Sequence, residues 1–411
     1  MKHGIRRMAV AGVLVAGLVG AIAPTAFAQS AITLKGSDTT YFVMDSITRS
    51  YNINKTVNTD GDVAFNVPPL TGAVDTTSAN KIFPGGYIVP ATAECTSPQI
   101  FGPTGASGVT GAVAPPNGSG QGKTKLINSA TAADGCTTVA RSSSGPGTTE
   151  AAQTQFFAYA LDALAWIKFA GNSVTAMSKD SLQKIYQCLP NTQVFGQASG
   201  TVAAAPTYQD WSQVPEGAAA GLSGPIKRYV AQDGSGTGKA WAKFLTGSDT
   251  FLNTACDTAF KGTVAQENDA TAITTDQAHS IYYYSYGQNY AQSKGVIADQ
   301  RNKSVLGALD QSGVAVKPGP TTINTSPTRY LFTRYVYNII DSRTAAYRPA
   351  LKMVGAGDLD GDPATPAANG YICSNAAQNT LKLYGFVPLK KVADANNNGL
   401  LSYCALNPTA L

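Results

Sequence analysis

Hydrophobic and polar positions change their period along the chain, and the pattern predicts strands followed by helices. Residues 31–34 form a short apolar run that predicts a strand, and residues 43–51 then carry apolar side chains at helical spacing. Residues 156–167 are densely apolar with Asp162 as the only charge, which is typical of a buried strand or of a strand that crosses between two lobes. Residues 178–189 are amphipathic and predict a helix. This alternation indicates an α/β architecture with mostly parallel sheets.

Four turns built from Ser, Thr and Gly lie next to these elements, at residues 36–41, 117–122, 141–146 and 233–238. Each turn offers hydroxyl and main-chain N–H donors without a bulky side chain. The first and the fourth run directly into a predicted helix, whose first N–H groups are unpaired. Helix N-caps explain any one such turn, whereas four turns together favour a site that holds an oxyanion with neutral donors. Both interpretations stay open on composition alone.

Neither a nucleotide nor a metal motif is complete in this sequence. The fourth turn, Ser235-Gly236-Thr237, lacks the Lys of a phosphate loop and the spacing of a dinucleotide turn. Residues 358–362 and 394–399 begin like calcium loops but lack the Glu at the twelfth position, so Asp/Asn-rich surface turns are the prediction. We therefore predict no cofactor and no metal.

The composition is that of a globular protein. The chain has 411 residues, of which 43% are hydrophobic and 13% are charged. This length is enough for two or three domains, each with a core of its own.

The N-terminal segment has the pattern of a secretory signal. Lys2, Arg6 and Arg7 precede an apolar run at residues 8–22, and the small-residue site Ala26-Phe27-Ala28 follows. We expect cleavage after Ala28 and a secreted, periplasmic or cell-envelope location. The apolar run is shorter than the roughly 20 residues of a membrane-spanning helix, so no transmembrane anchor is expected.

Charge and histidine content disfavour two classes of function. Cleavage would lower the formal net charge from +5 to about +2, and no basic runs remain, so nucleic acid is not an expected partner. His279 is the only histidine beyond the signal, and no Gly-x-Ser-x-Gly nucleophile turn accompanies it. We expect no enzymatic activity, and an envelope hydrolase is disfavoured.

Six cysteines lie beyond the signal, an even number that predicts three disulfides in an oxidising compartment. A zinc site is the competing interpretation, but no two cysteines have the close spacing of paired zinc ligands. Fifteen pairings are possible. We expect neighbours in sequence to pair, because each successive pair falls within one candidate domain segment: Cys95–Cys136, Cys188–Cys256 and Cys373–Cys404.

Taken in order, the segments resemble the phosphate-binding proteins that serve ABC transporters, in the form secreted by actinobacteria. The motifs that carry the resemblance are Gly-Ser-Asp-Thr-Thr at 36–40, Ala-Arg-Ser-Ser at 140–143, Asp-Trp at 210–211, Gly-Ser-Gly-Thr at 234–237 and Gly-Phe-Val-Pro-Leu at 385–389. They span most of the chain beyond the signal.

The resemblance implies a type II periplasmic-binding-protein fold, with two α/β lobes, a hinge and a central ligand cleft. Lobe I would comprise residues 29–160, with a loop-rich insert at about 53–118. Lobe II would comprise residues 161–285, and residues 286–411 would return to lobe I. A monomer is expected. The implied ligand-binding residues are Thr39, Thr40, Tyr41, Ser119, Arg141, Ser142, Ser144, Ser235, Gly236 and Thr237.

Two positions depart from the pattern of that family. Its members place an Asp in the third turn, where it accepts a proton from the ligand, but Ser144 stands there in this chain. They also place an Arg two residues before the Asp that precedes Gly-Ser-Gly-Thr, where this chain has Ala231. Arg228 and Arg141 are the candidates for supplying that charge.

The leading hypothesis is an exported solute-binding protein that closes on a small oxyanion, above all inorganic phosphate, for uptake through an ABC permease. The alternative is a secreted or envelope interaction protein on the same fold that has lost phosphate binding. The missing Asp and Arg and the long insert favour the alternative.

Overall fold

The computed structural model describes residues 32–54, 65–66, 87–88, 100–101, 118–133, 137–147, 153–189, 204–344, 347–354 and 370–389. The predicted signal, both calcium-like segments and the cysteines at 95, 136 and 404 lie outside these residues. Among the described helices, none combines the length and the apolar character needed to cross a membrane.

The helices are α1 (Tyr41–Asn54), α2 (Ser119–Ala132), α3 (Lys179–Tyr186), α4 (Pro215–Ala219), α5 (Gly236–Thr246), α6 (Tyr286–Ser293), α7 (Tyr347–Val354) and α8 (Asn375–Leu383), with the short 3-10 helices η3 (Trp211–Gln213), η4 (Gln277–His279) and η5 (Tyr371–Cys373). The strands are β1 (Ile32–Gly36), β2 (Phe65–Asn66), β3 (Tyr87–Ile88), β4 (Ile100–Phe101), β5 (Val139–Ser142), β6 (Thr154–Lys168), β7 (Ala176–Ser178), β8 (Cys188–Leu189), β9 (Ala205–Pro206), β10 (Lys227–Ala231), β11 (Thr263–Ala265), β12 (Ser280–Ser285), β13 (Val305–Leu306), β14 (Ala308–Gln311), β15 (Val314–Val316), β16 (Thr333–Asp341) and β17 (Val387–Pro388).

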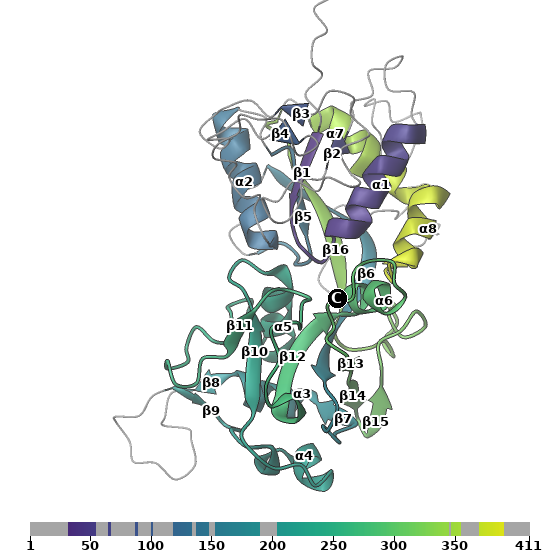
Figure 1. The fold of residues 1–411 in the computed structure, drawn as a ribbon. Coiled ribbons are helices and arrows are strands. Elements are labelled where there is room, and N and C mark those ends of the chain that lie inside the picture. The colour runs from purple at the N-terminus through teal and green to yellow at the C-terminus, as the bar shows by residue number, and fades with distance from the viewer. Residues whose placement is uncertain are drawn as a thin grey trace, which may run out of the picture.

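One ten-stranded sheet runs through the molecule in the order β11-β10-β12-β6-β16-β5-β1-β2, with β13 and β17 also paired to β6. At one end β1 is parallel to β2 and β5, and at the other β10 is parallel to β11 and β12. The long strands β6 and β16 are antiparallel to each other and lie between these two parallel groups. We call the part with β1, β2 and β5 the upper lobe and the part with β10, β11 and β12 the lower lobe, as drawn in Figure 1.

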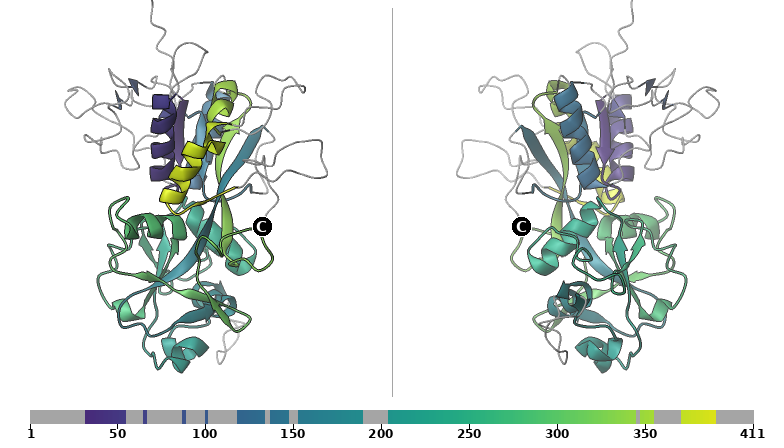
Figure 2. Two further views of the ribbon diagram at one scale, coloured as in Figure 1. Left: turned by 90° about the vertical axis from the view of Figure 1, so that its right-hand side faces the viewer. Right: turned by 90° about the vertical axis from the view of Figure 1, so that its left-hand side faces the viewer.

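Helices cover both faces of the upper lobe's sheet, as the two side views in Figure 2 show. Phe157 and Tyr159 of β6 pack in one core cluster with Tyr51 of α1, and α7 and α8 contribute to the same cluster. Phe156 points to the opposite face, because successive strand residues alternate, and it packs there with Leu126 of α2. A strand covered on both faces needs apolar residues at nearly every position, which explains the dense apolar stretch of β6.

The sequence pattern predicted several of these elements. The strand and helix expected at residues 31–51 are β1 and α1, and the apolar stretch at 156–167 lies within β6. The amphipathic helix expected from residue 178 is α3, in which Leu182, Ile185 and Tyr186 are buried. Ser178 caps that helix by accepting a hydrogen bond from the N–H of Ser181.

We propose that the chain completes its return to the upper lobe later in the sequence than the predicted residue 285. Strands β13 and β14 pair with β6 and β7, and the core of the lower lobe includes Leu309, Ile323 and Phe332. In our interpretation the chain therefore returns along β16. Such short strands leave little periodic signal, and their partners are more than 100 residues away in sequence.

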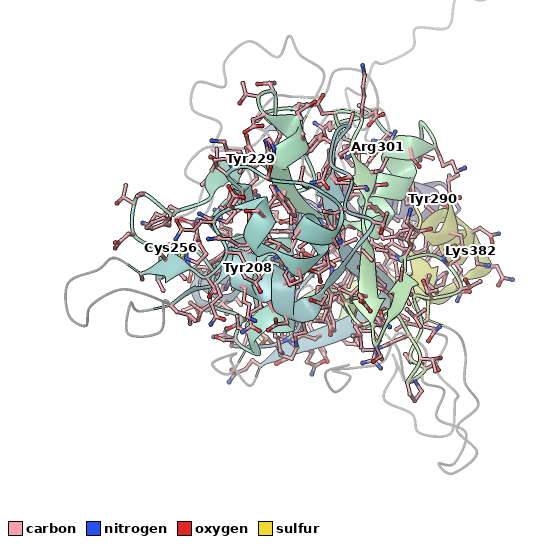
Figure 3. All side chains as sticks on the ribbon, turned by 90° about the horizontal axis from the view of Figure 1, so that it is seen from below. Tyr208, Tyr229, Cys256, Tyr290, Arg301 and Lys382 are labelled. Carbon is pink, nitrogen blue, oxygen red and sulfur yellow. A yellow bond between two sulfur atoms is a disulfide. The ribbon has the colours of Figure 1, made fainter. Side chains whose placement is uncertain are left out.

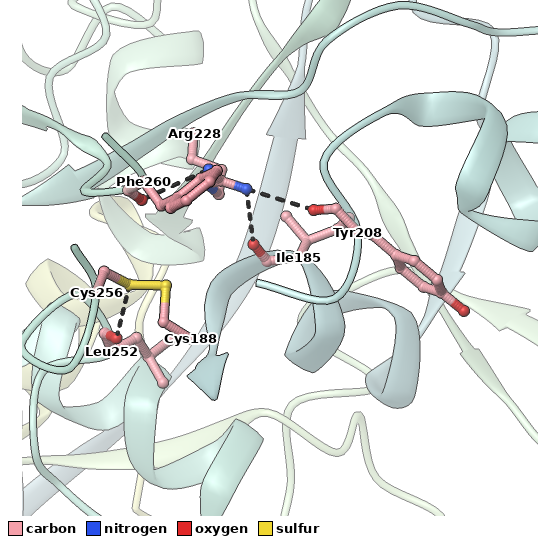
Figure 4. Close-up of a disulfide and its surroundings, with 7 residues drawn as sticks. All are labelled: Ile185, Cys188, Tyr208, Arg228, Leu252, Cys256 and Phe260. Atoms are coloured by element: carbon pink, nitrogen blue, oxygen red, sulfur yellow. Dashed lines mark hydrogen bonds between the residues drawn. A yellow bond between two sulfur atoms is a disulfide. The ribbon is translucent and has the colours of Figure 1, made fainter. Parts of the chain in front are cut away.

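A disulfide joins Cys188 of β8 to Cys256, as expected for neighbours in sequence, and closes a separation of 68 residues (Figure 4). Arg228 lies beside it and donates hydrogen bonds to the carbonyls of Ile185, Tyr208 and Phe260 at 3.5, 3.4 and 3.5 Å. The guanidinium thus ties together the loops around the disulfide.

Replacing both Cys188 and Cys256 with Ala should lower the free energy of unfolding by about 4 kcal/mol, because the unfolded chain would regain the freedom that the closed loop removes. Urea unfolding of the oxidised wild type and of the double variant measures the difference. Equal unfolding midpoints would show that this bond does not stabilise the lower lobe.

Candidate functional site

The turns of the upper lobe meet the N-terminus of α5 at the junction of the lobes. The N–H of Gly120, in the first turn of α2, donates a hydrogen bond to the carbonyl of Gly234 at 3.0 Å. Gly236 lies so close to the upper lobe that a Cβ there would be 2.0 Å from Oγ of Ser119 and 2.5 Å from Oγ of Ser143. Only glycine fits at this position, and the two lobes are in direct contact here.

Hydroxyl groups from both lobes converge on the carboxylate of Glu267, which is only 4% exposed. Thr237 of α5 donates to Oε1 at 2.8 Å, and Thr39 of the upper lobe donates to the same oxygen. Ser235 donates to Oε2 at 2.5 Å. The hydroxyl oxygens of Thr39 and Thr237 are 2.9 Å apart across the junction. We call Thr39, Ser235, Thr237 and Glu267 the hydroxyl cluster.

Local structure fixes each donor of the hydroxyl cluster. Ser235 is the N-cap of α5 and accepts a hydrogen bond from the N–H of Gly238 at 2.9 Å, which links the carboxylate to the positive end of the helix. Asn268 donates to the hydroxyl of Thr39 at 3.1 Å, and Gln288 of α6 donates to its carbonyl at 2.6 Å. The donors of the cluster are therefore held in place around the carboxylate of Glu267.

A buried cation, Arg334 of β16, adjoins the hydroxyl cluster. Its guanidinium donates to Oδ2 of Asp162 at 3.1 and 2.8 Å, to the carbonyl of Ser143 at 3.0 Å and to the hydroxyl of Thr237 at 3.0 Å. Asp162 is the residue directly opposite Arg334 on β6, and its second oxygen accepts the N–H of Gly287 at 3.0 Å. Both charged groups are thus hydrogen-bonded to each other and to neighbouring polar groups, as a buried ion pair requires.

A second carboxyl group, Asp38, lies next to Glu267 in the interior. It accepts hydrogen bonds from the amides of Gln232 and Gln266, at 3.1 and 2.5 Å. Burial, reinforced by repulsion from Glu267, raises the pKa of Asp38 well above its ordinary value. The folded protein therefore holds the proton of Asp38 to a higher pH than the unfolded chain does.

No protein-family model matches the sequence, and no curated protein matches it in sequence. Among solved structures, the chain is similar to one from Clostridium perfringens that is described as a phosphate ABC transporter substrate-binding protein with bound phosphate. The two are 13% identical, the match covers 88% of this chain and 100% of that chain, and the TM-score is 0.50. The chain is also similar to an ABC-type phosphate transport receptor from Vibrio cholerae, at 15% identity over 87% and 99% of the two chains, with a TM-score of 0.49.

The fold is that of type II periplasmic binding proteins. The predicted fold class, a two-lobed α/β fold of the type II periplasmic-binding-protein kind, is thereby confirmed. At 13% identity the similarity concerns the fold alone and assigns no ligand.

The structure brings together residues from all four of the predicted turns. Thr39, Ser235 and Thr237 surround Glu267, and Gly236 touches Ser119. Ser119 in turn accepts the N–H of Ser143 at 2.9 Å, which connects the second turn to the third.

Other predicted residues make hydrogen bonds within their own turns. Thr40 donates to the carbonyl of Ser37 at 3.4 Å, and Ser142 donates to the carbonyl of Ser144 at 2.7 Å. Ser144 points its N–H back at the hydroxyl of Ser142 at 3.2 Å.

Arg141 lies away from the hydroxyl cluster. It donates to the carbonyls of Leu34, Gly36 and Ser37 at 3.5, 3.1 and 2.5 Å, and its guanidinium lies 5.4 Å from the ring centre of Tyr41. Burial lowers the pKa of its guanidinium, while the nearby Asp38 opposes that shift. Its hydrogen bonds hold the end of β1. The other candidate for the missing cation, Arg228, lies beside the disulfide.

Sequence reasoning missed Glu267 and Arg334. Arg334 had a usable signal, because Asp162 is the only charge in the apolar stretch at 156–167 and a buried carboxylate requires a cation. Glu267 had none, since it stands in a polar stretch without periodicity. Among the described residues, no group of three His, Cys, Asp or Glu side chains could hold a metal ion.

Replacing Asp38 with Asn should stabilise the protein increasingly as the pH rises above about 4, where the carboxyl ionises in the unfolded chain. The folded wild type keeps its proton there, so it loses up to about 1.4 kcal/mol per pH unit until its raised pKa is reached, while Asn does not titrate. Thermal unfolding of both proteins between pH 4 and pH 8 measures the gap.

Asp180→Asn on α3 is the control for loss of a carboxylate as such, because Asp180 is exposed and its surface ion pair with Lys184 contributes little to stability. A gap between wild type and Asp38→Asn that is constant across this range would contradict a raised pKa for Asp38.

Proposed function

We propose that this chain is an exported, non-enzymatic solute-binding protein that closes its two lobes around a small oxyanion. The observation that carries the proposal is the hydroxyl cluster, in which Thr39, Ser235 and Thr237 aim three hydroxyls from both lobes at one buried carboxylate. A carboxylate is itself an oxyanion, so the donors have the placement and the surroundings that such a ligand requires.

In the proposed binding step, the three hydroxyls turn from Glu267 to the oxygens of the incoming anion. Glu267 then accepts a hydrogen bond from a proton-bearing oxygen of the ligand. In this arrangement Glu267 provides the carboxylate that is missing at Ser144. Arg334, whose guanidinium already contacts Thr237 at 3.0 Å, provides the cation that is missing at Ala231.

Inorganic phosphate is the ligand that we propose. An ionised carboxylate only accepts hydrogen bonds, and phosphate keeps a proton at neutral pH whereas sulfate does not. The Clostridium perfringens protein with this fold was solved with bound phosphate, which supports the same choice. Carrying the ligand to an ABC permease, as a monomer exported after cleavage near Ala28, completes the proposal and rests on the fold and on the N-terminal sequence pattern.

Calorimetric titration of the protein, stripped of ligand by unfolding and refolding with its disulfides intact, should give binding of phosphate and none of sulfate. In Glu267→Gln, the amide can donate a hydrogen bond to fully ionised sulfate. Sulfate binding should therefore appear, and the preference for phosphate should fall at least about tenfold.

Glu216→Gln is the matched control, because Glu216 is partly buried and accepts the N–H of Ser178 and the hydroxyl of Ser181 at the start of α3. Its variant should keep the preference for phosphate. If Glu267→Gln also keeps the wild-type preference, Glu267 does not accept a hydrogen bond from a proton-bearing oxygen of the ligand. If the wild type binds neither anion, the interaction-protein alternative is favoured, with Glu267 as the permanent partner of the three hydroxyls.

Replacing Thr237 with Val, which has nearly the same shape but no hydroxyl, should weaken phosphate binding by about 1–3 kcal/mol, because the buried anion loses a hydrogen-bond donor. Thr246→Val at the other end of α5, where the hydroxyl bonds the carbonyl of Ala242, is the control. Equal affinities of the two variants would remove Thr237 from the proposed site.

A further inference from the structure

A separate pocket of about 330 Å³ opens beside the hydroxyl cluster. Residues 143–146 of the upper lobe, α5 of the lower lobe and β16 line it, and Arg334 belongs both to this lining and to the contacts of Thr237. The volume falls within the range of sites for small organic ligands, roughly 300–1,000 Å³. It is larger than a five-atom anion such as phosphate fills.

The lining of this pocket is strongly basic. Lys179 at the start of α3 and Lys239 and Lys243 on α5 join Arg334, while Asp249 is the one carboxylate in the lining. Lys239 and Lys243 are four residues apart on one helix face, so their like charges repel. No ion pair within the described part of the chain involves any of the three lysines. This excess of positive charge would be neutralised by an anionic ligand.

One wall of the pocket is aromatic and rigid. Phe244 lines it and stacks on Phe332, with ring centres 5.3 Å apart and planes 9° apart. Tyr337 also lines it and packs edge-on against Phe156 at 5.7 Å, and Tyr335 lies beside Tyr337 at 6.1 Å. Rings that are supported from behind offer flat apolar surface at little entropic cost, and such surface suits a planar ring of a ligand.

We infer that this pocket binds an organic phosphate, a phosphate monoester that carries a planar ring. The lysines and Arg334 hold the phosphate group, and the aromatic wall holds the ring. Because the lining comes from both lobes, the bound ester favours their contact. The inference does not depend on phosphate binding at the hydroxyl cluster, since none of the three lysines belongs to that cluster.

Phenyl phosphate is the probe, and calorimetric titration measures its affinity for the wild type. Phosphate and phenol, which each carry one part of the probe, are titrated separately for comparison. The wild type should bind phenyl phosphate at least about tenfold more tightly than phenol. The double variant Lys239→Gln, Lys243→Gln should lose at least about tenfold in affinity for phenyl phosphate and far less in affinity for phosphate. Thermal unfolding establishes that the variant is folded.

Lys382→Gln is the matched control, because Lys382 is an exposed lysine of α8 in the upper lobe and does not line the pocket (Figure 3). It should bind phenyl phosphate as the wild type does.

The inference is overturned if the wild type does not bind phenyl phosphate or if the double lysine variant binds it with wild-type affinity. It is also overturned if Thr237→Val abolishes this binding while the lysine variant does not, since the ester would then occupy the hydroxyl cluster. Lysine-dependent binding of phenyl phosphate without any phosphate binding would refute the proposed function and leave the pocket assignment standing.

Discussion

The ion pair between Asp162 and Arg334 is the interaction on which the arrangement of the two lobes depends. The two residues face each other on β6 and β16, the strands that run between the lobes, and both are buried. A buried charge that loses its partner costs about 3–5 kcal/mol. A shift of one residue between the strands would also turn Arg334 to the opposite face of the sheet. The pair therefore fixes the register of the strands that join the lobes.

The same pair determines what surrounds it. Asp162 accepts the N–H of Gly287 and so places the start of α6, whose Gln288 holds the main chain of Thr39. Arg334 holds the carbonyl of Ser143 from the upper lobe and the hydroxyl of Thr237 from the lower lobe. One cation thus connects a turn of each lobe, and the hydroxyl cluster forms where those turns meet.

The fold was predictable from the sequence to the extent that its elements have a local signal. The spacing of apolar residues predicts α1 and α3, and the dense apolar stretch predicts β6, because these patterns reflect which face of each element is buried. The four turns were recognisable because Ser, Thr and Gly gather beside predicted strands and helices, where their donors are not hidden by bulky side chains. Pairing Cys188 with Cys256 followed from their order along the chain.

The rest of the site depends on contacts between residues that are far apart in sequence. Thr39 and Glu267 are 228 residues apart, and nothing around Glu267 distinguishes it from a surface carboxylate until β11 carries it to the N-terminus of α5. The departures at Ser144 and Ala231 indicated that a carboxylate and a cation were missing. Arg141 and Arg228 could be named from the sequence as replacements for the cation, but both donate their hydrogen bonds to main-chain carbonyls. Proximity in sequence was a poor guide here, because the pairing of distant strands decides which side chains meet between the lobes.

The hydroxyl cluster and the basic pocket differ in their electrostatics. The cluster holds Glu267 with neutral hydroxyls and a helix terminus, and the adjoining Arg334 is already paired with Asp162, so the cluster adds little long-range attraction for an anion. The three lysines of the adjoining pocket are unpaired with any described carboxylate, and a concave surface lined by one sign of charge concentrates counter-ions near it. Since Arg334 contributes to both, an anion drawn to the lysines arrives within reach of the guanidinium that contacts Thr237. The basic pocket would then attract anions, and the hydroxyl cluster would select among those small enough to enter.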